Sequence, residues 1–303
     1  MEFREVRSLV LLAELGNIQR VAEAVHLSPP GVHKHLKTLQ EELGVPLYER
    51  AGRSLKLTEA AECILPYFRQ MIAEHDTARR VLDEWKGVKR GLVRVGAGQI
   101  VATYLVPRVL EKFFSRYPGV NASIQAAPVR PLVERLSTGH IDLAFLAMSE
   151  LHEEPDLPTD DIDLLFDVTN LEMVFVSGTP RPARRCSIKS LTAVPFVSYE
   201  RELGINRVME HYFAAVGFHP RVVVRCDYTE TIKTMVQKVP GMSLLPLWAV
   251  EKEIKDRTLW LVKQQERPLS LKIVLASRKR RYAPPAVRAL IDTVREYLAQ
   301  RGR

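Results

Sequence analysis

Apolar side chains near the start of the chain recur at the spacing of amphipathic helices. Across residues 3–15 they return every three or four positions, which predicts a helix that ends at Gly16. Asn17 can cap a second helix over about 18–25, whose apolar positions follow the same spacing. Two short helices joined by a tight turn are therefore expected at this end of the chain.

A third predicted helix presents a basic face. Ser28 is a suitable N-cap, and Pro29 suits the first helical position because its missing N–H costs nothing there. The helix runs to about Leu43 with apolar residues inward, and its outward positions carry His33, Lys34, His35, Lys37 and Thr38. The three elements together predict a helix-turn-helix whose third helix reads DNA.

Two short strands, 44–50 and 54–58, are predicted to form a hairpin around residues 51–53 that acts as a wing against the phosphate backbone. The predicted DNA contacts are Arg20, Ser28, Pro29, Pro30, His33, Lys34, His35, Lys37, Arg50, Arg53 and Lys56. For the histidines and the wing arginines the alternative is a solvated polar surface. A metal site from the two histidines is disfavoured, because helical positions i and i+2 point in different directions.

A long helix follows the hairpin, from about Thr58 almost to Gly87. At 1.5 Å per residue it spans about 40 Å, and Pro66 is expected to bend or weaken its first turns. A small domain cannot bury so long an apolar stripe. We therefore expect this helix to pair with its copy in a second subunit.

Beyond a short basic hinge at 87–91 the pattern changes to alternating strands and helices. Strands at 92–97, 120–127 and 139–146, with helices at 104–117 and 131–138, predict a parallel sheet with right-handed crossovers. A second such unit is predicted from strands near 163–168, 171–177, 195–198, 221–226 and 242–245, with helices at 205–216 and 229–239. A strand at 269–276 returns to the first lobe before a terminal helix at 284–298, so two chain crossings create a hinge and a cleft.

The predicted fold class is therefore a multi-domain α/β protein. An all-α winged helix-turn-helix is expected over residues 1–58, and a linker and dimerisation helix with its hinge over 59–90. Two Rossmann-like lobes with a cleft between them are expected over 91–303. Lobe I takes 91–162 and 268–303, and lobe II takes 163–267.

Composition narrows the class of protein. The 303 residues are 46% hydrophobic and 26% charged, as in ordinary soluble globular proteins. No apolar run reaches the length of a membrane span, and the N-terminus lacks the features of a signal peptide. Cys63, Cys186 and Cys226 lie far apart, which argues against a disulfide framework or a zinc site. We expect a cytoplasmic protein without metal or cofactor.

The formal charge of +8 does not locate the DNA-binding end. Residues 1–90 hold 14 Lys+Arg against 13 Asp+Glu, a net of +1, whereas residues 263–303 hold 11 against 3, a net of +8. The basic run at 278–281 is interpreted as a solvated face. The DNA prediction rests on pattern and not on net charge.

Enzyme signatures are missing from the sequence. It holds no Gly-x-Ser-x-Gly elbow, phosphate-binding Gly-x-x-x-x-Gly-Lys loop or His-Glu-x-x-His pair. Gly96 and Gly98 follow a strand, but Val101 stands where a dinucleotide fingerprint needs its third glycine. We therefore expect no enzymatic activity.

The stretches 17–28, 43–50 and 57–60 resemble the signature of the LysR family of bacterial transcription regulators. The family usually begins its recognition helix with Ser-Gln-Pro/Ser-Ala-Val-Ser, whereas here Pro29 and His33 replace the Gln and the last Ser. The resemblance implies a winged helix-turn-helix regulator, and the departures imply an atypical target sequence.

The second half resembles the LysR sensor domain, which has the fold of periplasmic solute-binding proteins. The matching pieces lie at 104–107, 113–120, 139–144 and 241–246. The resemblance implies that residues 91–303 are an effector-binding domain. It also implies an effector bound at strand ends and helix N-termini, where open α/β sheets place ligands. The candidate residues are Gly98, Gln99, Ile100, Val101, Thr103, Val129, Arg130, Met148, Ser198, Tyr199, Arg201, Tyr228 and Thr229.

The chemistry of these candidates favours an acid. Unpaired N–H groups at helix N-termini suit a carboxylate, and Arg130 and Arg201 could clamp one. An apolar wall of Ile100, Val101, Met148 and Phe196 would favour a small organic or aromatic acid over a sugar. The alternatives are surface salt bridges for the arginines and helix capping by Gln99 and Thr103.

The predicted function is a sequence-specific, effector-responsive transcription regulator. Its expected partners are roughly palindromic double-stranded DNA, a small-molecule effector, RNA polymerase, and further copies of the chain in a homodimer through the long helix and a homotetramer. No membrane partner is expected. Two alternatives remain: a DNA-binding regulator without ligand response, and a cytoplasmic solute-binding protein, which would not account for residues 1–65.

Overall fold

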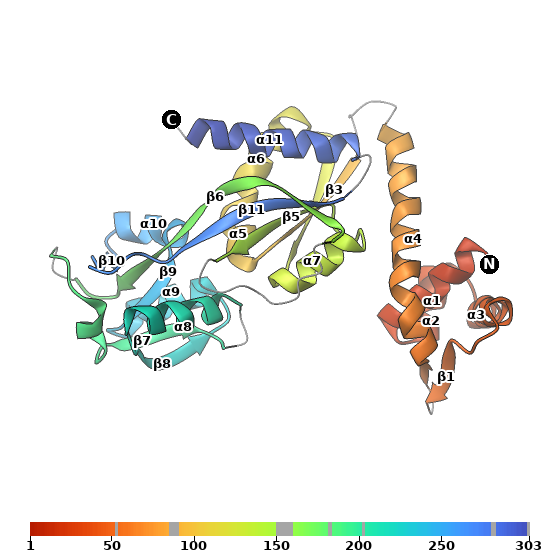
Figure 1. The fold of residues 1–303 in the computed structure, drawn as a ribbon, viewed down its shortest axis with the longest axis horizontal. Helices are drawn as coiled ribbons and strands as arrows, with labels where there is room; N and C mark the ends of the chain where they lie inside the picture. Colours follow the sequence, from red (N-terminus) through yellow and green to blue (C-terminus); the bar gives the residue numbers. More distant parts are fainter. Residues whose placement is uncertain are drawn as a thin grey trace. The chain divides into compact units, whose positions relative to one another are not determined.

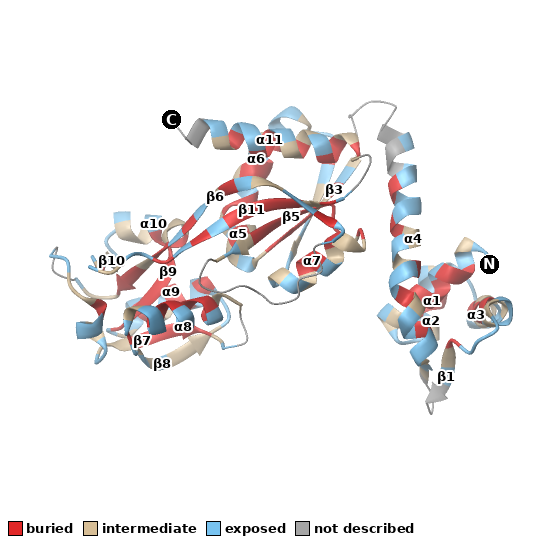
Figure 2. Cartoon of the chain, in the orientation of Figure 1, coloured by how far each residue is buried: buried red, intermediate tan, exposed pale blue. Residues whose placement is uncertain are grey.

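The computed structural model describes residues 1–51, 54–84, 91–149, 160–180, 184–201, 204–279 and 283–301. The chain divides into two compact units (Figure 1). The first comprises Met1–Trp85 with Thr138–His140, and the second comprises Lys86–Ser137 with Ile141–Arg303. Each unit buries its own apolar side chains (Figure 2).

The first unit begins with the three predicted helices, α1 (Phe3–Leu15), α2 (Ile18–Ala24) and α3 (Pro29–Leu43). Gly16 ends α1 in the left-handed conformation at φ 62°, as predicted. The Asn17 side chain caps α2 by accepting the backbone N–H groups of Gln19 at 2.8 Å and Arg20 at 3.3 Å. Local capping thus sets where these helices start and end. Their apolar faces form one core together with the first turns of the long helix that follows the hairpin.

The predicted hairpin and long helix are also present, although the first strand begins at Tyr48 and not at 44. Strands β1 (Tyr48–Ala51) and β2 (Ser54–Leu57) pair antiparallel, and α4 (Glu59–Glu84) continues through Pro66. The Thr58 hydroxyl donates to the carbonyl of Pro46 at 2.7 Å and accepts the N–H of Ala61 at 3.2 Å. This side chain therefore fastens the start of α4 to the chain that enters the wing.

Lobe I of the second unit has the predicted alternation of strands and helices. Its elements are β3 (Gly91–Ala97), α5 (Gln99–Tyr104), α6 (Val106–Arg116), β4 (Val120–Ala126), α7 (Val129–Ser137) and β5 (Leu143–Met148). The strands are parallel in the order β4-β3-β5. Two boundaries differ from the prediction. Residues 99–103 lie within α5, because helical hydrogen bonding begins directly after β3. The third strand begins at Leu143 and not at 139, because Gly139 adopts a left-handed turn conformation at φ 74°.

Lobe II repeats this topology with β7 (Pro195–Tyr199), α8 (Gly204–Val216), β8 (Arg221–Cys226), α9 (Thr229–Lys238) and β9 (Met242–Pro246). Its parallel order β8-β7-β9 matches β4-β3-β5 of lobe I. Elements that the sequence did not predict are the 3₁₀ turn η1 (Ile188–Leu191), α10 (Leu247–Lys255) and β10 (Trp260–Leu261).

Two elements connect the lobes. The predicted strands at 163–168 and 171–177 are one strand, β6 (Ile162–Ser177), because it pairs with β11 (Ser270–Arg278) and then with β9 without an intervening turn. Both pairings are antiparallel, so the nine-stranded sheet is mixed and not wholly parallel. The terminal helix α11 (Pro285–Arg301) follows β11. The two predicted crossings are confirmed: the chain leaves lobe I along β6 and re-enters it along β11.

A paired charge ties the parallel strands of lobe I together. Asp142, almost fully buried before β5, accepts from Nε and Nη2 of Arg94 at 3.2 and 3.1 Å and from the Arg94 backbone N–H at 2.9 Å.

No helix among the described residues is long and apolar enough to span a membrane.

Candidate DNA-binding and effector sites

The start of α3 has the geometry expected of a recognition helix. The Ser28 hydroxyl accepts the backbone N–H of Gly31 at 3.4 Å and so acts as the predicted N-cap. Pro29 and Pro30 occupy the first two helical positions and are exposed. These residues can touch a ligand, but the prolines have no N–H to donate to phosphate.

Four of the predicted basic DNA contacts are exposed, and they come from three elements of this unit. They are Arg20 on α2, Lys34 and Lys37 on α3, and Lys56 on β2. Lys37 makes an ion pair with Glu41 at 3.5 Å, and both side chains are largely exposed. Exposed lysines and arginines on a helix and a wing are suited to phosphate contacts.

The two histidines of α3 are less exposed than the sequence predicted. Nδ1 of His35 lies 3.0 Å from the hydroxyl of the fully buried Ser8 on α1, so His35 does not belong to the outer face. Its predicted outward position was wrong because α1 packs against this flank of α3, whereas its DNA contact stays a prediction. His33 is half-buried, and the centre of its ring lies 6.4 Å from that of Tyr48 on β1.

The two arginines predicted on the wing are Arg50 and Arg53. The Arg50 side chain and all of Arg53 lie outside the described residues. Their phosphate contacts stay predictions from the sequence.

The effector candidates follow the carboxyl ends of parallel strands. Those at 98–103 follow β3, 129–130 follow β4, Met148 ends β5, 198–201 end and follow β7, and 228–229 follow β8. In both lobes the first strand lies between the other two, so the chain reverses its winding beside it. Open α/β sheets bind ligands at that reversal.

Several candidate side chains point into the lobes. The Tyr199 hydroxyl lies 2.8 Å from the hydroxyl of Thr229, and both residues are buried. The buried Ser198 hydroxyl donates to Oδ1 of Asn206 on α8 at 3.3 Å. Tyr199 and Thr229 therefore connect the end of β7 to the first turn of α9.

Half of the predicted apolar wall lies in the core. Val101 and Phe196 are fully buried in the core; Phe196 packs edge-on against Phe213 and Phe218, because alternate positions of β7 face the helices that cover the sheet. Ile100 is half-buried and Met148 is 39% exposed, so these two remain available for a pocket.

The polar candidates of lobe I are at the surface. Thr103 donates to the carbonyl of Gln99 at 2.8 Å within α5, and neither side chain caps that helix, whose N-cap is Gly98. The capping alternative was therefore wrong. Arg130 is exposed, and so is Arg201 of lobe II.

One cation near the site was missed from the sequence. Nη1 of Arg225 on β8 donates to the carbonyl of Tyr199 at 3.0 Å and to Oδ1 of Asn206 at 3.3 Å. Asn206 is buried and also donates to Glu210 at 2.8 Å. The sequence contained a sign of this contact, because Arg225 directly follows the apolar run at 222–224. A charged side chain in a partly buried strand needs a hydrogen-bonding partner.

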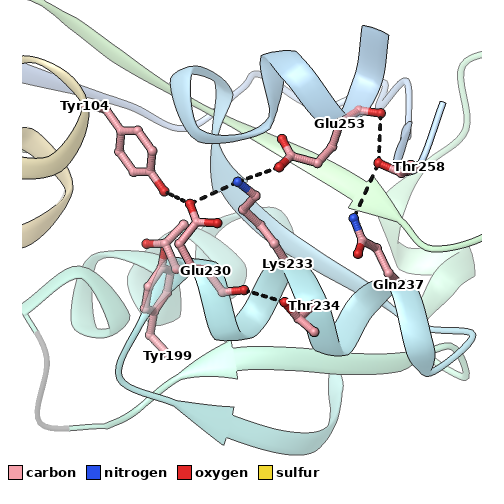
Figure 3. Close-up of polar contacts among 9 residues, drawn as sticks. Tyr104, Tyr199, Glu230, Lys233, Thr234, Gln237, Glu253 and Thr258 are labelled. Atoms are coloured by element: carbon pink, nitrogen blue, oxygen red, sulfur yellow. Dashed lines mark hydrogen bonds and ion pairs between the residues drawn. The ribbon is translucent and has the colours of Figure 1, made fainter. Parts of the chain in front are cut away.

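A second missed group joins the two lobes (Figure 3). The Tyr104 hydroxyl at the end of α5 donates to Glu230 on α9 at 2.5 Å. The ammonium of Lys233 lies 2.9 Å from the Glu230 carboxylate and 2.6 Å from that of Glu253 on α10. These residues are separated widely in sequence, so no local pattern marks them.

The electrostatics of this group follow from its contacts. Burial raises the pKa of Tyr104 far above its ordinary value, and the hydrogen bond to anionic Glu230 raises it further. Burial also acts to raise the pKa of Glu230, but the hydrogen bonds from Tyr104 and Lys233 outweigh it and leave that pKa lowered. Tyr104 is therefore a neutral donor and Glu230 a carboxylate near neutral pH.

Comparisons with known protein families match both units. Residues 3–62 match the family described as "Bacterial regulatory helix-turn-helix protein, lysR family". Residues 86–299 match the family described as "LysR substrate binding domain". The chain belongs to the LysR family of transcription regulators. It therefore combines a DNA-binding helix-turn-helix with an effector-binding domain, and the family's members are regulators and not enzymes.

Relatives of similar length carry related names. A "Probable RuBisCO transcriptional regulator" of Trieres chinensis is 26% identical over 293 residues, covering 94% of this chain and 93% of the relative. The "HTH-type transcriptional activator CmpR" of Synechocystis is 28% identical over 246 residues, covering 80% of this chain and 78% of the relative. Both support the family assignment.

Solved structures share the fold. A full-length OxyR variant from Pseudomonas aeruginosa has a TM-score of 0.72 at 22% identity, covering 97% of this chain and 95% of that one. Full-length CbnR in complex with its target DNA has a TM-score of 0.68 at 20% identity, covering 98% and 99%. These likenesses confirm the predicted class: a helical helix-turn-helix followed by an α/β effector-binding domain.

Proposed function

We propose that this LysR-type regulator senses a small organic acid held between lobe I and lobe II. The observation that carries the proposal is the Tyr104–Glu230 hydrogen bond, which brings the end of α5 against the first turn of α9. Both helices follow carboxyl ends of parallel strands, where ligands of open α/β sheets bind. Candidates from the two lobes therefore face a shared region.

The chemistry of that region supports an acid. Helix α9 has no side-chain cap, so its first N–H groups remain suited to an anion. Arg130, Arg201 and Arg225 supply guanidinium groups near the strand ends, and Ile100 and Met148 supply apolar surface. The remaining proposed contacts are Gly98, Gln99, Thr103, Val129, Ser198, Tyr199, Tyr228 and Thr229, whereas Val101 and Phe196 belong to the core.

For DNA we propose that α3 enters the major groove and that the wing lies against the phosphates. Lys34, Lys37 and Arg20 are exposed where such contacts need them. Two chains would pair through α4, which would set two recognition helices on a roughly palindromic site. Further association of dimers would give a tetramer. We infer that this tetramer acts on RNA polymerase in the cytoplasm. The exposed Tyr67 on α4 supports a helix pair.

The DNA proposal is tested by salt-dependent binding to DNA from upstream of the chain's own gene. Replacing Lys34 with Ala should weaken binding to all sequences and reduce the slope of log affinity against log salt by about one for each phosphate that the variant no longer neutralises. Lys238→Ala, an exposed lysine on α9, is the matched control and should change neither quantity. An unchanged slope in Lys34→Ala would refute its phosphate role.

The effector proposal is tested by a thermal-shift screen of small organic acids on the full chain. An acid present at 100 times its Kd should stabilise the folded protein by about 2.7 kcal/mol. Arg225→Ala and Arg201→Ala should reduce that shift for the same acid. If no acid shifts the melting temperature while DNA still binds, the chain is a regulator without ligand response. If DNA does not bind, the solute-binding alternative gains support.

A further inference from the structure

The hydrogen bond between Tyr104 and Glu230 is made by residues 126 positions apart, on helices of different lobes. Tyr104 is the last residue of α5, directly after the lobe I candidates, and Glu230 follows the lobe II candidate Thr229. A contact here fixes the distance between the two halves of the proposed effector site.

The Glu230 carboxylate is held in place from its own side. Lys233, one turn later on α9, is buried and lies between Glu230 and Glu253 of α10. Figure 3 shows this line of side chains running from Tyr104 through Glu230 and Lys233 to Glu253. The ammonium group joins α9 to α10 and restricts the side chain that Tyr104 must meet.

We propose that Tyr104 and Glu230 are positioning residues that clasp α5 to α9 and set the spacing of the lobes. The hydroxyl-to-carboxylate bond is charge-assisted, which makes it stronger than a bond between neutral groups. Its loss lets the lobes separate about β6 and β11, the two strands that connect them. The inference rests on the proposed effector function only for the meaning of this spacing, and its test needs no effector.

The experiment is hydrogen–deuterium exchange on the full-length, ligand-free protein, for wild type, Tyr104→Phe, Glu230→Ala and the double variant. A hydrogen bond to a charged group stabilises a contact, but solvent weakens it here because Glu230 is largely exposed. We therefore expect the exchange rate to rise by roughly three- to tenfold when this bond is removed. Tyr104→Phe should raise exchange of the hydrogen-bonded amides of α9, from Ile232 onward, and Glu230→Ala should raise it in α5. The double variant should exchange no faster than the faster single variant.

Thr234→Ala is the control. Its hydroxyl donates only to the backbone carbonyl of Glu230 in the same helix, at 3.0 Å, so its removal should not alter α5. The proposal is overturned if each substitution changes exchange only in the lobe that carries it, or if the two effects multiply in the double variant. A failed organic-acid screen would leave this result unaffected, so failure of the clasp and failure of the proposed function are distinguishable.

Discussion

The imidazole Nδ1 of His35 lies 3.0 Å from the hydroxyl of Ser8, which is fully buried between α1 and α3. Ser8 has a single hydroxyl proton, and its hydroxyl also donates to the carbonyl of Arg4 at 3.0 Å. His35 therefore donates from Nδ1 to Ser8. This histidine joins two helices of the DNA-binding unit from a position in which the sequence predicted a DNA contact.

His35→Ala should thus lower the free energy of unfolding by about 1 kcal/mol, because a buried hydroxyl loses a partner. The slope of DNA affinity against salt should stay at the wild-type value. Chemical denaturation and fluorescence anisotropy measure the two quantities. A stable variant with a reduced slope would instead return His35 to the phosphate contacts.

His26 occupies a backbone conformation that favours glycine. It has φ 55° and follows α2, where its N–H bonds to the carbonyl of Glu23 and that of Leu27 bonds to Ala22. This is the Schellman ending of a helix, in which glycine is usual. His26→Gly should stabilise the protein by about 0.5–1 kcal/mol, since relief of strain exceeds the added entropy of the unfolded chain. His26→Ala keeps the Cβ and should bring no gain; equal melting temperatures for the two variants would argue against strain.

Gly178 packs against the backbone of α9. A Cβ at this position would lie 1.8 Å from the carbonyl oxygen of Val236. Gly178→Ala should therefore cost about 3 kcal/mol in urea unfolding, since backbone and not a mobile side chain must move. Gly204→Ala, which meets open space, is the control and should be tolerated. A wild-type midpoint for Gly178→Ala would mean that α9 shifts freely.

Glu266 gives a pH-dependent contribution to stability. Burial acts to raise its pKa, but hydrogen bonds from Ser187 at 2.6 Å and from the N–H of Ile188 at 3.2 Å outweigh it and lower that pKa. A carboxylate whose pKa is lowered in the folded state stabilises the protein at pH values above its ordinary pKa of 4.5. This stabilisation is lost as the pH falls through the pKa of the folded state.

Glu266→Gln should accordingly destabilise the protein by about 1 kcal/mol at pH 7, with a difference that shrinks as the pH is lowered below about 4.5. Urea midpoints at a series of pH values measure this. Glu172→Gln, an exposed glutamate on β6, should match wild type throughout. A difference that grows in acid would contradict the assignment.

The helix-turn-helix was predictable from sequence because its signals are local. Gly16, Asn17 and Ser28 act within one helical turn of themselves, so their residue types sufficed to predict where helices begin and end. The alternation of strands and helices likewise placed the effector candidates at strand ends, since periodicity follows from which face of an element is buried.

Contacts between distant segments could not be predicted in that way. The continuity of β6 depends on its partners β11 and β9, about 70 to 110 residues further along the chain. The inward turn of His35 and the burial of Val101 and Phe196 depend on neighbouring elements that local spacing does not specify. The same holds for Tyr104 and Glu230: each is an ordinary polar residue on its own helix, and only packing of the two lobes makes them partners.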